Sequence, residues 1–224
     1  MSKKYVYDYP HPAVAADIVV FTIVNGSLGL LLIKRGEAPF KGSWALPGGF
    51  VREDETVEMA AKRELAEEAG VINCSPTQFG IYSEPERDPR QRVISVAFYD
   101  CVRADEVTLK PGTDAVDAEW IEIGCIKSDD LAFDHARIIA DALAELRKSC
   151  RETPVAAKML PRFFKLTDLQ LTIETITGAP IDKRNFRRQT EEKGWLEKTD
   201  QEERGAHRPA SLYTLTQDYT NDVR

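Results

Sequence analysis

The stretch that decides the fold is residues 49–71, GFVREDETVEMAAKRELAEEAGV. It contains three carboxylates, Glu64, Glu67 and Glu68, which are three and four positions apart and therefore share one face of a helix. Like charges placed in this way repel each other, so we expect a cation among them, and a hard divalent ion with oxygen ligands, such as Mg²⁺, fits best. The stretch therefore predicts a glycine turn, a helix over roughly residues 57–69 and a magnesium site on that helix.

The same stretch has a recognisable spacing. Arg63 can reach back to Glu55 through a charge-assisted pair, and Gly70 ends the helix where a left-handed residue costs least. Gly49 is followed after five residues by Glu55, and seven residues later by Arg-Glu-aliphatic-x-Glu-Glu-x-Gly-aliphatic. This pattern resembles the Nudix box at every defining position. An ordinary acidic surface helix is the simpler interpretation, but it does not account for so many residues placed at fixed spacing.

The resemblance to the Nudix family implies roles for individual residues. Glu67 and Glu68 would be metal ligands, Glu64 a ligand or a general base, and a carbonyl at Gly48 or Gly49 a further ligand. The predicted catalytic and metal-binding residues are therefore the three box carboxylates. A further catalytic carboxylate outside the box is expected in members that cleave ADP-ribose, and three residues in loops are candidates: Asp88, Asp114 and Asp117.

Other residues are candidates for ligand binding: Arg35, Gly48, Gly49 and Phe50. Arg35 could pair with a phosphate or could be a structural cation at a strand end. Trp44 and Phe50 could stack on a base or cap the core, and we favour the core for both. The three histidines are scattered along the chain, and we assign no function to any of them.

Composition restricts the class of protein. The 224 residues are 42% hydrophobic and 30% charged, an ordinary globular profile. The net charge of −7 argues against a nucleic-acid-binding protein, but residues 1–150 carry −8 and residues 151–224 carry +1. The four cysteines form no Cys-x-x-Cys pair, so we expect reduced thiols and no zinc site. The sequence shows no apolar signal core and no apolar run long enough for a bilayer, which predicts a cytoplasmic protein without membrane contact.

The pattern along the chain predicts two domains, residues 1–150 and 151–224. In the first, strands are expected over residues 16–24 and 28–35 with an Asn25-Gly26 hairpin turn, and further strands over 77–83, 92–102 and 118–123. A long amphipathic helix is expected over residues 133–150. With the box helix, these elements indicate an α+β protein whose first domain is a Nudix α/β/α sandwich with a mixed sheet.

The second domain has a different organisation. Thr167 to Gln170 has the pattern of a capping box before an apolar helical face that ends at Gly178. Asp182 is a candidate N-cap for a second helix that ends at Gly194, with Phe186 directed inward. Apolar stretches 195–196 and 212–215, separated by polar residues, suggest a β-hairpin. Helix, turn, helix and hairpin together predict a winged helix-turn-helix domain.

The second helix and the wing carry residue types that contact DNA. Arginine suits guanine and phosphate, asparagine suits adenine, and glycine in the wing allows close backbone approach. A solvated basic face is the simpler interpretation, but the position in the layout favours contact with a double-stranded DNA operator. The candidate DNA-binding residues are Lys183, Arg184, Asn185, Arg187, Arg188, His207 and Arg208.

Further motifs extend the resemblance to both domains. The segment from Pro39 to Val51, the run from Asp182 to Arg188 and the stretch Gly205-Ala-His-Arg-Pro-Ala resemble Nudix-related transcriptional regulators of the NrtR type. The resemblance implies a repressor of NAD-biosynthesis genes that responds to ADP-ribose. It implies a Nudix domain that senses the effector and dimerises, and a winged domain that binds the operator as part of a homodimer.

Two alternatives to a repressor that senses a nucleotide remain open. Many regulators of this type have lost box carboxylates, whereas this chain keeps Glu64, Glu67 and Glu68. The first alternative is therefore a Mg²⁺-dependent Nudix pyrophosphatase that cleaves ADP-ribose-like substrates. The second is a regulator of sugar catabolism that senses a sugar or a sugar phosphate.

Overall fold

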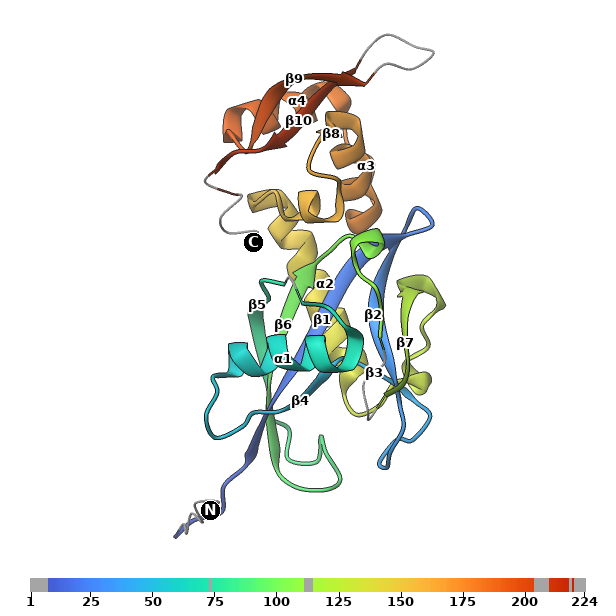
Figure 1. Cartoon of the computed structure of the whole chain (residues 1–224), viewed down its shortest axis with the longest axis vertical. Helices are drawn as coiled ribbons and strands as arrows, with labels where there is room; N and C mark the ends of the chain where they lie inside the picture. Colours follow the sequence, from blue (N-terminus) through green and yellow to red (C-terminus); the bar gives the residue numbers. More distant parts are fainter. Residues whose placement is uncertain (1–7, 73, 111–114, 204–209, 218, 220–224) are drawn as a thin grey trace.

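The computed structural model describes residues 8–72, 74–110, 115–203, 210–217 and 219, and Figure 1 shows the whole chain. Its first part is a seven-stranded mixed sheet in which β1 and β6 run parallel and the other neighbours run antiparallel. The strand order is β3-β2-β1-β6-β5, with β4 paired to β1 and β7 paired to β2. The strands are β1 (Ala13–Val24), β2 (Ser27–Arg35), β3 (Trp44–Ala45), β4 (Gly48–Phe50), β5 (Thr77–Tyr82), β6 (Val93–Cys101) and β7 (Ala115–Glu122).

Two helices cover the two faces of this sheet, α1 (Val57–Ala69) and α2 (His135–Glu152). Because successive side chains of a strand point to opposite faces, β1 contributes side chains to a hydrophobic core on each face of the sheet. Ile18 and Val20 belong to the hydrophobic cluster beneath α1, whereas Val19 and Phe21 belong to the cluster beneath α2. The expected α/β/α sandwich with a mixed sheet is confirmed.

The second part is a winged helix-turn-helix. Helices α3 (Leu166–Thr177) and α4 (Lys183–Lys193) are followed by a hairpin of β9 (Leu196–Glu203) and β10 (Ala210–Leu215), and β8 (Phe164–Lys165) completes a three-stranded sheet. Short 3₁₀ helices connect the larger elements: η1 (Ala104–Glu106), η2 (Ile123–Cys125), η3 (Ser128–Asp130) and η4 (Val155–Met159). This layout confirms the predicted fold class of the C-terminal part.

Most turns and helix ends lie where the local sequence signals predict them. Asn25 and Gly26 have φ of 50° and 80°, as a type I′ hairpin turn requires. Helix α1 ends at Gly70 with φ of 74°. The side chain of Asp182 accepts the amide of Asn185 at 2.8 Å and so caps α4.

Several elements differ from the sequence prediction. Strands β3, β4 and β8 are not among the expected strands, β1 begins at Ala13 rather than at residue 16, and β9 extends to Glu203. Strand β7 begins earlier, at Ala115, and α2 is displaced by two residues toward the C-terminus. Helix α3 begins before Thr167, because Asp168 accepts the amide of Lys165 at 3.1 Å. Gln170 instead donates to the carbonyl oxygen of Ile181 at 3.0 Å and so holds the turn between α3 and α4.

The two parts share one hydrophobic core. Phe21 and Leu30 of the large sheet, Leu146 of α2, and Leu169 and Phe186 of the winged unit belong to one buried cluster. In Figure 1, α2 runs from the sheet toward the end of the molecule that carries α3 and α4. Helix α2 continues through the predicted boundary at residue 150 to Glu152, so that boundary stays a prediction.

Candidate functional site

Arg63 organises the loop and helix of residues 49–71. Its Nε and Nη2 donate to both carboxylate oxygens of Glu55 at 2.9 and 2.6 Å, as expected from the sequence. Its Nη1 lies 2.6 Å from Glu64 Oε1 and 3.1 Å from Glu67 Oε2. The hydrogen bond from Arg63 holds the pKa of Glu55 at about 2, well below its ordinary value. A guanidinium group therefore supplies part of the positive charge that the acidic face of α1 requires.

Of the three carboxylates on the acidic face of α1, Glu64 and Glu68 are less exposed to solvent than Glu67. A Cβ on Gly49 would lie 2.2 Å from Glu64 Oε1, so any larger residue there would displace that carboxylate from its position. Glu68 accepts the amide of Gly48 at 2.9 Å. Burial, with smaller effects of Glu64 and Asp17, raises the pKa of Glu68 to about 8. Glu68 is thus a partly buried carboxyl group whose ionised form Arg35 compensates only in part.

The residues fit a hard divalent cation by the chemistry of their donors. Glu64 and Glu68 are carboxylates beside the backbone of Gly48 and Gly49, and ionising Glu68 calls for a positive charge. Glu67 is half-exposed and pairs with Arg52 and Arg63. Within the described part of the chain, no three His, Cys, Asp or Glu side chains already converge on one metal position. Glu64 and Glu67 both contact Arg63, so for them to share a cation with Glu68 they would have to turn away from Arg63.

A cavity of about 60 Å³ opens beside the backbone of Gly48 and Gly49. Small-molecule sites usually have volumes of roughly 300–1,000 Å³, so a nucleotide fits here only if the cavity widens or if part of the nucleotide lies outside it. Its wall includes Gly48, Gly49, Arg35 and Phe50, so four predicted ligand-binding residues come together. Phe50 is 40% exposed and faces the guanidinium of Arg90 at 5.5 Å, so the expectation that it caps the core is wrong. Trp44 packs against the core, as expected.

Cations and aromatic rings form one side of the cavity. The guanidinium groups of Arg35 and Arg90 lie 4.9 and 5.6 Å from the ring centre of Phe133. Burial, and then the charge of Arg90, lowers the pKa of Arg35. The guanidinium group of Arg90 forms two hydrogen bonds to Asp88, at 3.0 and 2.7 Å. Two arginines near apolar rings are suited to binding a phosphate-bearing, planar ligand.

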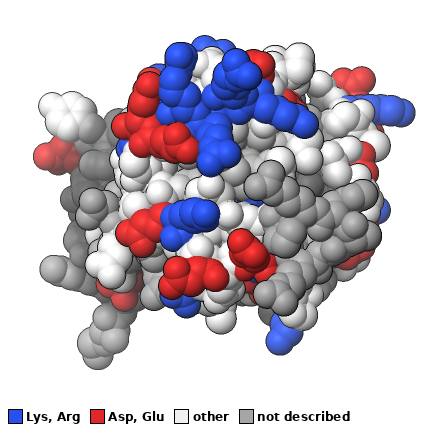
Figure 2. All heavy atoms as spheres, turned by 90° about the horizontal axis from the view of Figure 1, so that it is seen from above, with Lys and Arg blue, Asp and Glu red and all other residues white. Residues whose placement is uncertain are grey.

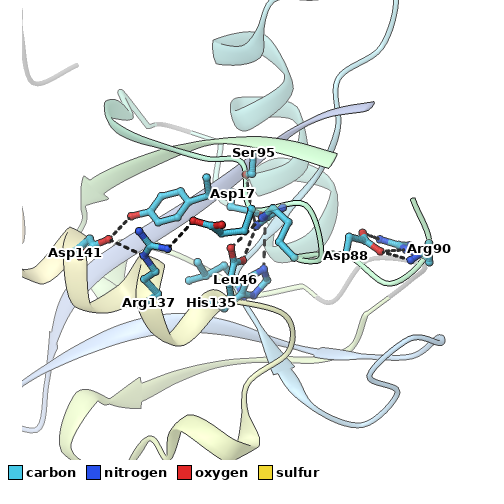
Figure 3. Close-up of polar contacts among 12 residues, drawn as sticks. Asp17, Leu46, Asp88, Arg90, Ser95, His135, Arg137 and Asp141 are labelled. Atoms are coloured by element: carbon cyan, nitrogen blue, oxygen red, sulfur yellow. Dashed lines mark hydrogen bonds and ion pairs between the residues drawn. The ribbon is translucent and has the colours of Figure 1, made fainter. Parts of the chain in front are cut away.

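The cavity also contains a polar network that the sequence did not reveal. The carboxylate of Asp17 accepts from Arg87 and Ser95, and Arg87 also pairs with Asp134 at 2.7 Å. His135 Nδ1 accepts the amide of Leu46 at 2.9 Å, and burial lowers the pKa of His135, which keeps the ring neutral. Figure 3 shows Asp17 between Ser95 and His135, with the Asp88–Arg90 pair to one side.

One sequence signal could have identified this network. Asp17 interrupts an otherwise apolar strand and is only 7% exposed, and a buried charge in a strand requires a partner. Of the carboxylates considered outside the box, Asp88 lines the cavity and Asp117 lies on β7. Asp114 lies outside the described residues.

The second candidate region is the surface of α4. Phe186 is buried, which confirms that it points inward, and five cations of the helix are exposed: Lys183, Arg184, Arg187, Arg188 and Lys193. Figure 2, which looks down on this end of the molecule, shows Lys and Arg gathered in one patch with acidic side chains beside it. His207 and Arg208, the candidates in the wing, lie outside the described residues.

Two of the exposed cations of α4 have partners on their own helix. Arg187 pairs with Glu191 at 3.1 Å, and Arg188 pairs with Glu192 at 3.8 Å and donates to Asn185 at 2.7 Å. Exposed pairs of this kind contribute about 0.5 kcal/mol or less, so a phosphate can replace the acidic partner at little cost. Among the residues the structure describes, no helix is long and apolar enough to cross a membrane.

Comparison with known proteins agrees with both regions. Residues 12–142 match the NUDIX domain, and residues 156–215 match the NrtR DNA-binding winged helix domain. The ADPR responsive transcriptional repressor NtrR of Acinetobacter baylyi is 35% identical over 95% of this chain and 86% of its own length. The ADP-ribose pyrophosphatase of Methanocaldococcus jannaschii is 48% identical over 62% of this chain and 77% of its own.

Solved structures show the same two-part arrangement. Shewanella oneidensis NrtR complexed with a 27mer DNA superposes with a TM-score of 0.82 at 30% identity, covering 93% of this chain and 95% of that chain. The NUDIX domain of the same protein, complexed with ADP ribose, superposes with a TM-score of 0.57 at 29% identity, covering 62% of this chain and 94% of that chain.

Proposed function

This chain belongs to the Nudix family and carries an NrtR-type DNA-binding winged helix domain, and on that basis we propose that it is a DNA-binding transcriptional repressor whose effector is ADP-ribose or a related nucleotide. The observation that carries the proposal is the combination of α4, with buried Phe186 and five exposed cations, and an arginine-lined cavity in the domain joined to it. Control of NAD-biosynthesis genes in the cytoplasm is part of the same proposal.

The winged domain binds the operator through α4 and the wing. The proposed DNA-contacting residues are Lys183, Arg184, Asn185, Arg187, Arg188, His207 and Arg208. One winged domain reads one half-site, so the protein acts as a homodimer on a palindromic operator with half-sites about 34–36 Å apart or a multiple of that distance.

The cavity binds the effector. Arg35 and Arg90 hold its phosphate groups, and Phe50 and Phe133 line the space for a planar or apolar part. The backbone of Gly48 and Gly49 forms the side of the cavity next to the box carboxylates. The named relatives respond to, cleave or bind ADP-ribose, which favours a nucleotide effector over the alternative of a sugar or a sugar phosphate.

The proposal is tested with a variant of α4. Arg184→Ala plus Arg187→Ala removes two exposed cations without touching the core, so we expect normal folding and a large loss of operator affinity. The slope of log affinity against log salt should also fall, because fewer phosphates are neutralised. Lys148→Ala, which removes an exposed cation from α2, is the matched control. Unchanged affinity and salt slope in the double variant would exclude α4 as the recognition helix.

A second candidate function is a Mg²⁺-dependent pyrophosphatase acting on ADP-ribose-like substrates. The observation that favours it is the intact set of box carboxylates, together with the similarity to a pyrophosphatase. Glu64, Glu67 and Glu68 would hold Mg²⁺, with a carbonyl oxygen of Gly48 or Gly49. The ion would neutralise phosphate oxygens and lower the pKa of a bound water.

The chain's own groups would perform the remaining tasks of that reaction. The arginines of the cavity bind and orient the pyrophosphate, and the proton acceptor would be either Glu64 or the cavity residue Asp88, the latter after release from Arg90. Incubation of the protein with ADP-ribose and Mg²⁺, followed by chromatography for AMP, decides the matter. Unchanged ADP-ribose after long incubation rules out that substrate. The two functions are compatible, because slow hydrolysis would reset the sensor.

A further inference from the structure

The segment that leads into α2 lies in the wall of the cavity and is strained. Phe133 has φ of 52°, a left-handed conformation that is unusual for a bulky residue. Its ring lines the cavity between Arg35, at 4.9 Å, and Phe40, at 4.8 Å. Strained backbone of this kind persists only where the surroundings hold it, and it is typical of switch regions. The start of α2 is therefore sensitive to what fills the cavity.

Asp134, the next residue, has two competing hydrogen-bond donors: an amide in the first turn of α2 and the guanidinium group of Arg87. It occupies the N-cap position of α2, where an aspartate side chain normally accepts an amide of the first turn, yet here it caps nothing. Both of its carboxylate oxygens accept from Arg87 instead, at 3.0 and 2.7 Å. Arg87 lines the cavity, and the described residues offer its Nη1 no acceptor. Loss of Arg87 would free Asp134 to cap its own helix.

The opposite end of α2 contacts both helices of the winged unit. Arg147 donates to the carbonyl oxygen of Ile176, at the end of α3, at 3.0 Å. Lys193, the last residue of α4, donates to the carbonyl oxygen of Arg151 in the last turn of α2. Leu146 is fully buried in the hydrophobic cluster that also contains Leu169 of α3 and Phe186 of α4. The 18 residues of α2 thus join the cavity to the recognition helix over about 27 Å.

We propose that Arg87 senses the effector by exchanging Asp134 for an anionic group of the ligand, and that α2 transmits this exchange to α4. The inference rests on the proposed function of a repressor with a nucleotide effector. Without ligand, the Arg87–Asp134 pair holds the first turn of α2 and the DNA-binding arrangement. With ligand, Asp134 turns to cap α2, the strained segment at Phe133 relaxes, and the helix shifts against α3 and α4. The ligand drives this change because it binds the released arrangement more tightly.

The exchange is tested by Asp134→Asn. Asparagine caps a helix as well as aspartate but cannot form the ion pair with Arg87, so this variant favours the released arrangement. We expect tighter ADP-ribose binding and weaker operator binding, each by about fivefold or more, the lower end of typical coupling factors. Asp141→Asn is the matched control on the same helix, because Asp141 contacts the hydroxyl of Tyr82 and lies outside this cavity. Wild-type affinities for both ligands in Asp134→Asn would overturn the exchange.

The transmission is tested by Arg147→Met, which keeps the apolar stem and removes the contact to the carbonyl of Ile176. Arg147 touches neither proposed binding site, so we expect each ligand alone to bind as in the wild type. The factor by which ADP-ribose weakens operator binding should fall about fivefold or more, because coupling is carried by the α2–α3 contact. Lys148→Met changes the neighbouring exposed residue and should leave the factor unchanged. An unchanged factor in Arg147→Met would exclude this route.

Measurements on the wild-type protein in the same series distinguish failure of the proposed function from failure of the Arg87–Asp134 exchange. Absence of operator binding, or operator binding that ADP-ribose does not weaken, contradicts the proposed function itself. A wild-type response that survives unchanged in Asp134→Asn and Arg147→Met contradicts only the present inference. Circular dichroism and thermal unfolding of each variant show that a changed affinity does not result from loss of the fold.

Discussion

Replacement of Glu68 by glutamine should stabilise the metal-free protein at pH 8 and have little effect at pH 5. Burial raises the pKa of this carboxyl group from 4.5 to about 8 in the folded protein. Between these values the unfolded chain has lost the proton and the folded protein retains it. The free energy of unfolding therefore falls as pH rises from about 4.5 to 8. Glutamine does not titrate and still offers an oxygen to the amide of Gly48.

The size of the effect follows from the difference between the two pKa values. At 1.36 kcal/mol for each pKa unit, the upper limit is about 5 kcal/mol. Water entering the cavity and rearrangement of the carboxylate reduce the cost of ionisation, so we expect Glu68→Gln to gain roughly 2–4 kcal/mol over the wild type at pH 8. At pH 5, half a unit above the unfolded pKa, the same relation leaves a difference of only about 0.8 kcal/mol.

Urea denaturation in EDTA at several pH values measures this effect. Glu67→Gln is the control, because Glu67 is a box carboxylate that is half-exposed and paired with arginines. Added Mg²⁺ should restore much of the wild-type stability at pH 8 and release protons, since a metal binds the ionised carboxylate. The reasoning is refuted if wild-type stability does not fall between pH 5 and 8, or if Glu68→Gln gains nothing at pH 8.

Two further predictions concern packing. Gly49→Ala places a Cβ 2.2 Å from a carboxylate oxygen of Glu64. Calorimetric titration should therefore show Mg²⁺ affinity reduced about tenfold or more. The control is Gly124→Ala, where the added Cβ meets open space, and equal metal affinities of the two variants would contradict this prediction. Phe186→Ala removes the buried side chain that holds α4, so urea denaturation should show that the free energy of unfolding falls by about 3–5 kcal/mol. Leu171→Ala, on the exposed face of α3, should lower it by less than about 0.5 kcal/mol. Equal losses in the two variants would show that α4 is not held through the shared core.

Elements fixed by neighbouring residues could be predicted from the sequence. The bounds of α1 and α4 agree with prediction, because Gly70, Asp182 and Gly194 act on the backbone within a few residues of their own position. The hairpin at Asn25 and Gly26 was predictable for the same reason. The start of α3 was not, since Thr167 and Asp168 are both capping residues and the folded chain uses the second.

The cavity could be predicted only in part. Gly48 and Gly49 belong to a local motif, whereas Asp17, Arg87 and His135 come from three distant segments and meet only after the sheet has formed. Spacing along the chain carries no information about such contacts. The sequence likewise does not reveal that the first turn of α2 is paired with Arg87.

Fluorescence anisotropy of a labelled DNA duplex, taken from upstream of the protein's own gene and neighbouring operons and titrated with ADP-ribose, tests the central claim most directly. A repressor controlled through its Nudix domain should bind such a duplex tightly and in a salt-sensitive manner, and saturating ADP-ribose should release it. Arg184→Ala plus Arg187→Ala should abolish the tight binding. Affinity no greater than for a random duplex of the same length, with steady release of AMP in Mg²⁺, would contradict the account and identify the protein as a pyrophosphatase.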